Sequence, residues 1–305
     1  MICRSDRPGT CWRRPPWPTA CGGRKGPTPT PPREPSVDGR RPEPSSCMRA
    51  RTWRRPVSEN IRIQAASLTH QGLVRKANED SILQRDDIGL WIVADGMGGH
   101  QGGKFASSTV VEALSGIELD HDGEGLLSGV QRAVGAANTA IYEASQNGLR
   151  MGTTIVGLTL DDTCFTCFWA GDSRAYLLRD AKLYRLTKDH TRVQDMVDSG
   201  LLTSEEAASH PMAHVLSRAI GVEEQVQLGT VRDVLLANDV FFLCSDGVHG
   251  VVKDSELTET LLHRGPAGAC KELLELVLKR GAPDNASMIV VACQQATAIA
   301  IPLDQ

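Results

Sequence analysis

Hydrophobic residues between residues 58 and 297 fall into short runs with polar residues between them. Four closely spaced runs are rich in β-branched or aromatic residues: 153–160, 164–170, 175–178 and 182–186. Such runs, separated only by turn residues, are typical of antiparallel hairpins. Further strands are predicted at 61–68, 81–83, 89–94, 226–231, 240–244 and 287–292.

Helical periodicity appears between these strands. One apolar stripe steps by three and four residues, which predicts an amphipathic helix: Leu127, Val130, Val134, Ala137, Ile141 and Ala144. Helices are also predicted at 105–114 and 270–277, and polar helical turns at 191–209, with a capping pattern from Thr203 to Glu206. Because helices and strands do not alternate one by one, we expect antiparallel sheets covered by helices rather than a doubly wound parallel sheet.

The composition divides the chain into unlike parts. Residues 1–57 hold 12 of the 16 prolines, and 13 Lys and Arg against 4 Asp and Glu. The remaining 248 residues hold 20 Lys and Arg against 33 Asp and Glu. The first part cannot bury enough apolar surface to offset its ordering entropy. We therefore predict a disordered basic tail at 1–57, a globular domain at 58–297 and a short C-terminal tail at 298–305.

Three interpretations of the basic tail stay open. In the first, it is a flexible extension without a specific role, or the start of translation has been placed too early and Met48 is the alternative start. In the second, it is a proline-rich ligand of a partner domain. In the third, its charge attracts it to nucleic acid or to an anionic membrane. The scattered basic residues favour the first. No apolar run reaches the roughly 18 residues of a membrane span, and the N-terminus lacks a secretory signal. We expect a cytoplasmic monomer without a nucleic-acid partner.

Five of the nine cysteines lie in the domain, and Cys164 and Cys167 form a CxxC pair. This spacing occurs in redox and zinc sites. Here it lies in a strand-like run, where residues three apart point to opposite faces, and no second pair completes a zinc site. Buried free thiols in a reducing cytoplasm are therefore expected.

Aspartates recur next to the ends of the predicted strands: Asp80, Asp95, Asp172, Asp246 and Asp284. Strand ends beside turns are where a rigid scaffold presents side chains to solvent. Carboxylates that are packed together stay ionised only if cations lie among them. Hard oxygen ligands without clustered His or Cys favour Mg²⁺ or Mn²⁺ over zinc.

A pair of such ions predicts hydrolysis of phosphate esters. Two metals about 3.5–4 Å apart lower the pKa of a shared water and orient it as hydroxide. Arg75 lies five residues before Asp80, and an arginine donates two parallel hydrogen bonds to phosphate oxygens. Each feature alone is weak, because an Asp-Gly pair is commonly only a turn, so the inference depends on all of them together.

Six motifs occur in a characteristic order: Arg75 with Asn78-Glu-Asp80, Asp95-Gly-Met-Gly-Gly99, Gly152-Thr-Thr154, Gly171-Asp-Ser-Arg174, Ser245-Asp-Gly247 and Asp284-Asn285. Over about residues 60–295 the chain resembles the metal-dependent protein phosphatase family, of the protein phosphatase 2C type, and is similar to bacterial members. The resemblance implies an α+β fold: a four-layer α-β-β-α sandwich of two antiparallel sheets flanked by antiparallel helices.

The resemblance also implies ligands for two catalytic Mn²⁺ or Mg²⁺ ions. By that likeness, Asp80, Asp95, Asp246 and Asp284 would hold them, together with the Gly96 carbonyl. A hydroxide bridging the two ions would attack the phosphoserine or phosphothreonine phosphorus directly, without a phosphoenzyme.

Four other residues receive roles from the same resemblance. Glu79 would bind water coordinated to a metal, and Asp172, together with Asp246, would hold a third ion. Arg75 would hold the substrate phosphate, and Asn285 would lie behind the ligands. A flap at 193–219 would tune substrate choice or merely cover the sheet edge.

One position departs from the family pattern. Many eukaryotic relatives carry a histidine, proposed as a general acid, where this chain has Met97, which has no proton to donate. The leaving oxygen must then take its proton from a metal-bound water or another group. His100 is expected to be a surface residue beside the glycine turn, and Asp189 and His190 are expected to be structural.

The expected function is therefore a serine/threonine phosphatase that opposes a bacterial Ser/Thr kinase. One alternative is a pseudophosphatase that binds phosphoproteins without hydrolysing them, which loss of a metal aspartate would favour; none is lost. Another is a phosphatase of small anti-sigma-type regulators. Those relatives usually carry sensor domains, whereas only the tail is additional here.

Overall fold

The computed structural model describes residues 61–99, 101–118, 125–146, 151–161, 163–208 and 210–295, all within one compact unit. The predictions for the tails at 1–57 and 298–305, for Met48 and for His100 lie outside the described residues. None of the helices in the described part of the chain combines the length and apolar character needed to cross a membrane.

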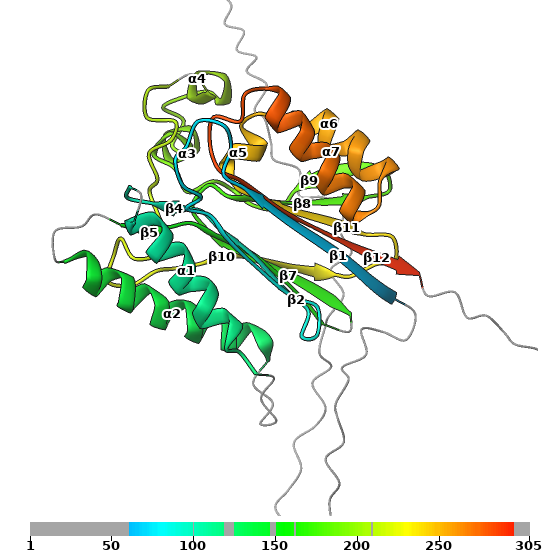
Figure 1. Cartoon of the computed structure of the whole chain (residues 1–305), viewed down its shortest axis with the longest axis horizontal. Coiled ribbons are helices and arrows are strands. Elements are labelled where there is room, and N and C mark those ends of the chain that lie inside the picture. The colour runs from blue at the N-terminus through cyan, green and yellow to red at the C-terminus, as the bar shows by residue number, and fades with distance from the viewer. Residues whose placement is uncertain are drawn as a thin grey trace, which may run out of the picture. The chain divides into compact units, whose positions relative to one another are not determined.

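Two five-stranded antiparallel sheets lie face to face (Figure 1). The first has the order β1 (Ile61–His70), β12 (Ala286–Gln295), β11 (Val240–Cys244), β8 (Arg174–Arg179) and β9 (Lys182–Arg185). The second has the order β10 (Gly229–Val234), β7 (Cys164–Ala170), β6 (Ile155–Leu160), β3 (Leu90–Ala94) and β2 (Ser81–Arg85). A small ladder pairs β4 (Gly96–Met97) with β5 (Gly152–Thr153).

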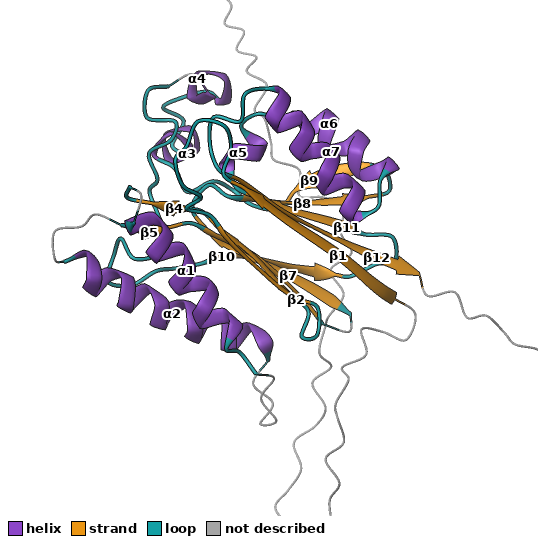
Figure 2. Ribbon diagram, in the orientation of Figure 1, coloured by secondary structure: helices purple, strands orange, loops and turns teal. Residues whose placement is uncertain are grey.

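Helices cover the outer face of each sheet (Figure 2). The second sheet is covered by α1 (Gly102–Ser115) and α2 (Leu126–Ser145), and the first by α5 (Asp246–His249), α6 (Asp254–His263) and α7 (Pro266–Lys279). Two short helices, α3 (Arg192–Asp198) and α4 (Ser204–Ala208), lie in the predicted flap. The four-layer α-β-β-α sandwich predicted from the sequence is confirmed.

The strands are continuous apolar runs because both of their faces are buried. In β3, Trp91 packs between the two sheets, whereas the next residue, Ile92, packs beneath α1 and α2. In β11, Phe241 and Phe242 divide in the same way between the sheet interface and the layer beneath α6 and α7. Successive side chains of a strand point to opposite faces, so one run of residues supplies two core layers.

Several predicted elements need correction. The strand predicted at 226–231 is β10 at Gly229–Val234, because Val226 and Leu228 pack against the α1–α2 layer instead of joining the ladder. The run 153–160 is interrupted at Thr154, whose backbone N–H donates to Asp95 O. Helix α6 was not predicted, because its apolar contacts with the core are limited to a few positions in a polar sequence.

The cysteine prediction is largely confirmed. All five cysteines among the described residues are free, and Cys164 and Cys167 lie three apart on β7. Cys167 is buried, as expected, but Cys164 is only half-buried, because it begins the strand directly after the exposed Thr163.

A buried ion pair joins β8 to the turn before β11. Arg179 donates from Nε and Nη2 to the two oxygens of Asp239, at 2.6 and 2.5 Å. The side chains are only 7% and 1% exposed, so removing Asp239 takes the bidentate carboxylate partner from a buried guanidinium. We expect Asp239→Ala to lower the free energy of unfolding by about 3–5 kcal/mol, measured by urea denaturation.

The matched control is Glu272→Ala, which removes the exposed partner of Arg264. This change should cost less than about 1 kcal/mol, because a solvated ion pair contributes little. Equal losses in the two variants would contradict a structural role for the buried pair.

Candidate active site

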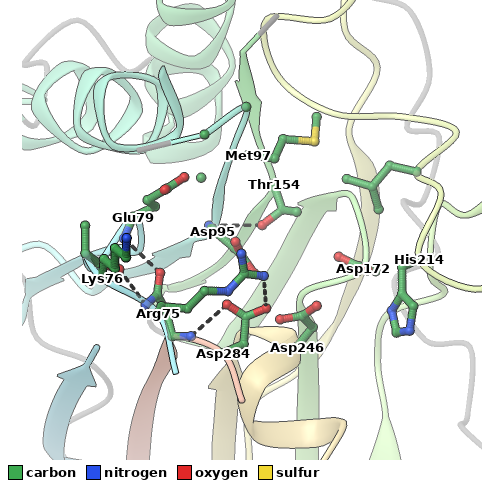
Figure 3. Close-up of a pocket in the computed structure, with 16 residues that line it drawn as sticks. Arg75, Lys76, Glu79, Asp95, Met97, Thr154, Asp172, His214, Asp246 and Asp284 are labelled. Atoms are coloured by element: carbon green, nitrogen blue, oxygen red, sulfur yellow. Dashed lines mark hydrogen bonds and ion pairs between the residues drawn. The ribbon is translucent and has the colours of Figure 1, made fainter. Parts of the chain in front are cut away.

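A cavity of about 370 Å³ lies where the β1–β2 loop, the ends of β3 and β11 and the start of β12 approach one another (Figure 3). All but one of the residues predicted to form the site line it: Arg75, Glu79, Asp95, Gly96, Asp172, Asp246, Asp284 and Asn285. The exception is Asp80, which is buried. The structure therefore brings together side chains that are up to 210 residues apart in the chain.

Asp95 follows the buried strand β3, and the Gly152-Thr-Thr154 motif holds its backbone. Its N–H donates to Thr154 Oγ1 at 3.1 Å, and its carbonyl accepts from Thr154 N and Thr153 Oγ1, both at 2.8 Å. This motif had no assigned role at the sequence level. The contacts indicate that it fixes the position at which the Asp95 carboxylate enters the cavity.

Gly96 and Gly103 allow the start of α1 to approach the carboxylate loops. A Cβ atom on Gly96 would lie 2.2 Å from Gly103 O, and one on Gly103 would lie 2.1 Å from Glu79 Oε2. Neither position has room for a side chain. This close approach keeps the Gly96 backbone and the Glu79 carboxylate together at one end of the cavity.

Asp246 begins α5 directly after β11, and the next residue is held against the loop before β12. A Cβ atom on Gly247 would lie 1.9 Å from Asn285 O. Asn285 itself accepts from Glu79 N at 2.9 Å and donates to the carbonyls of Gln71 and Ala77 at 2.8 and 2.9 Å. Asn285 therefore ties the β1–β2 loop to β12, which agrees with its predicted place behind the ligands.

Asp80 has one satisfied and one unsatisfied carboxylate oxygen. Its Oδ2 accepts from Ser245 Oγ at 2.9 Å, whereas Oδ1 is buried with no hydrogen-bond partner. Burial raises the pKa of Asp80 to about 6, although hydrogen bonds from Ser287 and Ser245 lower it. A buried oxygen without a donor is costly, and a cation among the carboxylates would satisfy it.

Arg75 reaches the cavity and pairs with one of the predicted ligands. Its Nη2 lies 2.6 Å from Asp284 Oδ2, and the two side chains are 57% and 31% exposed. Both residues are therefore accessible to a ligand from solvent. The predicted phosphate-binding arginine thus lies directly beside the predicted metal-binding aspartates.

Asp172 lies in the turn between β7 and β8, and several contacts hold this turn. Gly171 has a φ of +111°, and a Cβ atom on it would lie 2.6 Å from Thr154 Cγ2. Arg174 pairs with Asp189 at 2.7 Å, and His249 Nε2 lies 3.0 Å from Asp172 O. The expectation that Asp189 is structural agrees with this pairing, and His190, which stacks on Trp169, is also structural.

The aspartates strongly perturb one another. Burial, followed by the charges of Asp80 and Asp246, raises the pKa of Asp95. Burial and the charge of Asp284 raise the pKa of Asp246, and a hydrogen bond with Asp95 opposes this shift. Burial and the charge of Asp246 raise the pKa of Asp172 to about 7. The protein alone therefore does not compensate the negative charge of these groups.

The residues fit divalent oxygen-seeking cations. Within the described ranges, no group of three or more His, Cys, Asp or Glu side chains is already arranged to hold a metal ion. Carboxylates that repel one another do not converge without a cation between them. The all-oxygen donor set around one cavity and the unpartnered Asp80 Oδ1 are what a Mn²⁺ or Mg²⁺ site requires.

Other residues of the site received no individual role from the sequence, although Leu216 and His214 lie in the predicted flap. Met97, Thr154, Leu216, Lys76 and His214 also line the cavity. Lys104 Nζ donates to Asp80 O at 2.8 Å, and Ser107 Oγ donates to Glu79 O at 2.5 Å. These contacts join segments that are distant in sequence, so no local pattern signals them.

Comparison with known proteins identifies the family. The family model for protein phosphatase 2C matches residues 55–195. The serine/threonine phosphatase stp of Listeria monocytogenes is 34% identical over 203 residues, which is 63% of this chain and 81% of that protein. The chain belongs to the protein phosphatase 2C family. The resemblance inferred from the six motifs is thereby confirmed.

Another relative of this protein phosphatase 2C chain is much longer than the chain itself. The serine/threonine protein phosphatase PstP of Mycobacterium tuberculosis is 39% identical over 231 residues, which is 75% of this chain. The match spans only 44% of PstP, less than half of its length. The similarity therefore concerns one part of the mycobacterial protein.

Solved structures of the family share this fold. PppA of Pseudomonas aeruginosa, described as a regulatory component of T6SS, has a TM-score of 0.70 and 37% identity, covering 77% of this chain and 98% of that one. The catalytic domain of PstP in complex with two manganese ions has a TM-score of 0.69 and 36% identity, covering 77% and 99%. The two manganese ions bound in that catalytic domain support the two-ion Mn²⁺ or Mg²⁺ site predicted from the sequence; a third ion stays a prediction.

The raised pKa of Asp172 predicts a pH-dependent effect on stability in the absence of metal. An unfolded aspartate has a pKa of about 3.9, and the folded value is about 7. The protonated form therefore stabilises the fold below the unfolded pKa, and this contribution is lost as the pH rises through 7. In EDTA, we expect Asp172→Asn to gain stability relative to the unmutated protein as the pH rises from 5 to 8.

Urea denaturation of both proteins at the two pH values measures this difference. Comparing the variant with its parent cancels the contributions of other titrating groups, including His249 and His190, whose pKa values burial lowers to about 3 and about 4. A difference in unfolding free energy that stays constant with pH, or that falls as the pH rises, would contradict the assigned burial of Asp172.

Proposed function

We propose that this protein is a metal-dependent serine/threonine phosphatase that hydrolyses phosphoserine and phosphothreonine in proteins. The observation that carries the proposal is that Arg75 lines the same cavity as four of the aspartates and pairs with one of them, Asp284. An arginine fork is suited to a phosphoryl group, and an all-carboxylate donor set is suited to Mn²⁺ or Mg²⁺. Together they provide for binding of a phosphate monoester and for its hydrolysis.

We assign the metal ions to the predicted ligands. Asp80, Asp95, Asp246 and Asp284 would hold two ions, with the Gly96 carbonyl as a further ligand. When bound, these ions neutralise charge on the phosphoryl oxygens and lower the pKa of a shared water. Such cations would compensate the charge of Asp95 and Asp246, whose pKa values desolvation and neighbouring carboxylates raise in the protein alone.

The remaining residues have supporting roles in the proposal. Glu79 would hold coordinated water, and Asp172 would contribute to a third ion together with Asp246. Arg75 would leave Asp284 and donate to the substrate phosphate, which the exposure of both side chains permits. Asn285 would keep the Glu79 loop in place through its three hydrogen bonds.

The substrate environment follows from the same chemistry. Phosphoserine and phosphothreonine are products of protein kinases, so we propose that the protein opposes a bacterial Ser/Thr kinase in the cytoplasm. The free cysteines of the described residues agree with a reducing compartment. The flap supplies His214 and Leu216 to the cavity wall and is therefore placed to contact the substrate. The monomeric state and the lack of a nucleic-acid partner stay predictions.

We expect the full chain to hydrolyse a phosphothreonine peptide with Mn²⁺ or Mg²⁺ and to lose this activity in EDTA. Inhibitors of unrelated serine/threonine phosphatases should not affect it. Asp246→Asn and Asp80→Asn should reduce turnover to background while the far-UV circular dichroism spectrum is kept, because each removes a metal ligand. Phosphate release measures the activity.

The matched control is Asp87→Asn, an exposed aspartate that pairs with Arg85 away from the cavity. It should leave turnover unchanged. Hydrolysis by Asp246→Asn at the parental rate would overturn the site assignment. A folded parent protein that binds the phosphopeptide but never hydrolyses it, with either metal, would instead indicate a pseudophosphatase.

A further inference from the structure

The proposed reaction needs a proton donor for its leaving oxygen, and none of the predicted metal ligands has been assigned this role. Serine and threonine leave as strongly basic alkoxides, so a proton donor at the leaving oxygen accelerates the reaction. Met97, which lines the cavity, carries a thioether and has no proton to give. A proton donor for this oxygen must therefore come from another group at the cavity.

His214 is the one histidine of the described residues that lines this cavity. Histidine is the side chain whose ordinary titration range spans neutral pH. His249 is half-buried, does not line the cavity, and contacts the backbone carbonyl of Asp172 through Nε2 at 3.0 Å. His190 contacts Gly171 N and stacks on Trp169.

The flap backbone holds His214 at the wall of the cavity. Arg192 N donates to Val215 O at 2.8 Å, and Thr191 and Leu216 form an isolated β-bridge, so the chain is fixed on the C-terminal side of His214. Val215 N also donates to Met212 O at 3.0 Å, which closes a turn around His214. The imidazole lies on the side of the cavity where Asp172 and Asp246 lie (Figure 3).

Carboxylates outnumber cations around the cavity that His214 lines. The charged groups that line the same cavity are two cations and five carboxylates: Arg75, Lys76, Glu79, Asp95, Asp172, Asp246 and Asp284. Burial raises the pKa of Asp246, and the positive charge of His214 acts in the opposite direction, so the two side chains lie within electrostatic reach of each other. In the flap itself, Arg218, four residues after His214, is the nearest charged residue in sequence, and Glu206 and Glu205 come next.

Lys76 is the other donor that lines the cavity, but it lies beside Glu79, away from His214 (Figure 3). A lysine ammonium is a weak acid that gives up its proton poorly near neutral pH. Arg75 does not lose its proton in proteins, and it is assigned to the phosphate. Asp172 also lines the cavity, but it is assigned to a third ion. Among the cavity side chains that have no such assignment, position and acidity therefore single out His214.

We propose that His214 is the general acid that protonates the leaving serine or threonine oxygen. The inference rests on the proposed phosphatase function. Water attacks phosphorus, a new P–O bond forms, and the bond from phosphorus to the side-chain oxygen breaks with its electron pair. The proton on the imidazolium passes to that oxygen, and the neutral imidazole then takes a proton from solvent. The proton of the attacking water is released to solvent.

Two substrates that differ in their leaving group test this role. The full chain with Mn²⁺ is assayed with a phosphothreonine peptide, which needs protonation of its leaving oxygen, and with p-nitrophenyl phosphate, whose phenolate leaves without a proton. His214→Gln should lower kcat for the peptide by about 10²–10⁴-fold and leave kcat for p-nitrophenyl phosphate close to the parental value. The limb of the pH profile that falls toward high pH should disappear for the peptide.

The control variant is His210→Gln, in the same flap segment. His210 does not line the cavity, and its Nδ1 accepts from Met212 N at 3.2 Å. This variant should leave both activities unchanged. Thermal unfolding and a Mn²⁺ titration of His214→Gln, followed by calorimetry, should match those of the parent, because the exposed ring is not among the assigned metal ligands.

Three results would overturn the proposal: equal loss of kcat with both substrates, a rise in KM for the peptide at unchanged kcat, or no change at all. The first indicates a disturbed site, the second a substrate-binding role, and the third an uninvolved residue. Failure of the proposed function itself is distinguishable, because the parent protein would then hydrolyse neither substrate.

A series of aryl phosphates gives a second readout. The rate at which the His214→Gln variant hydrolyses them should depend more steeply on the basicity of the leaving group than the rate of the parent protein.

Discussion

The structure depends on the accommodation of several carboxylates in one small volume. Burial is the main cause that raises the pKa values of four of these carboxylates: Asp80, Asp95, Asp172 and Asp246. Neither hydrogen bonds nor Arg75 compensate this charge fully, and Asp80 Oδ1 has no partner. Cations among the carboxylates would compensate the negative charge and give Asp80 Oδ1 a partner. The metal ions would therefore stabilise the fold as well as serve the reaction.

The sandwich makes this arrangement possible by ending several buried strands at one place. Asp95 follows β3 and Asp246 follows β11, which lie in different sheets, so each sheet supplies at least one carboxylate. Short polar contacts then join the sheets at this end: Ser245 donates to Asp80, and Asn285 holds the Glu79 loop. Two rigid layers and these hydrogen bonds hold the aspartates near one another against their mutual repulsion.

Much of this was predictable from the sequence, for identifiable reasons. Strands with both faces buried are continuous apolar runs, and aspartates at their ends stand out against them, as Asp95 does after β3. Elements whose core contacts are few, such as α6, leave too weak a periodicity to predict. The predicted bounds of β10 were three residues too early because Val226 and Leu228 are apolar. These two side chains pack against the layer of α1 and α2, and the sequence pattern alone does not distinguish such packing from strand pairing.

The supporting contacts of the site were beyond the sequence for a different reason. Lys104 meets Asp80 O and His249 meets Asp172 O only because the fold brings distant segments together. His214 belongs to the predicted flap, but its entry into the cavity depends on the bridge between Thr191 and Leu216. The identity of a metal-binding aspartate is local in sequence, whereas the groups that orient it or complete its chemistry are defined only in three dimensions.

The most direct test of the account is the dependence of folding stability on free Mn²⁺ at constant pH. If the folded protein alone binds two ions, the unfolding free energy above the dissociation constants should rise by about 2.7 kcal/mol for each tenfold increase in free Mn²⁺, twice the increment for one ion. Urea denaturation over a buffered series of Mn²⁺ concentrations measures this slope. A stability that does not change with Mn²⁺ would contradict the claim that cations hold the carboxylates together.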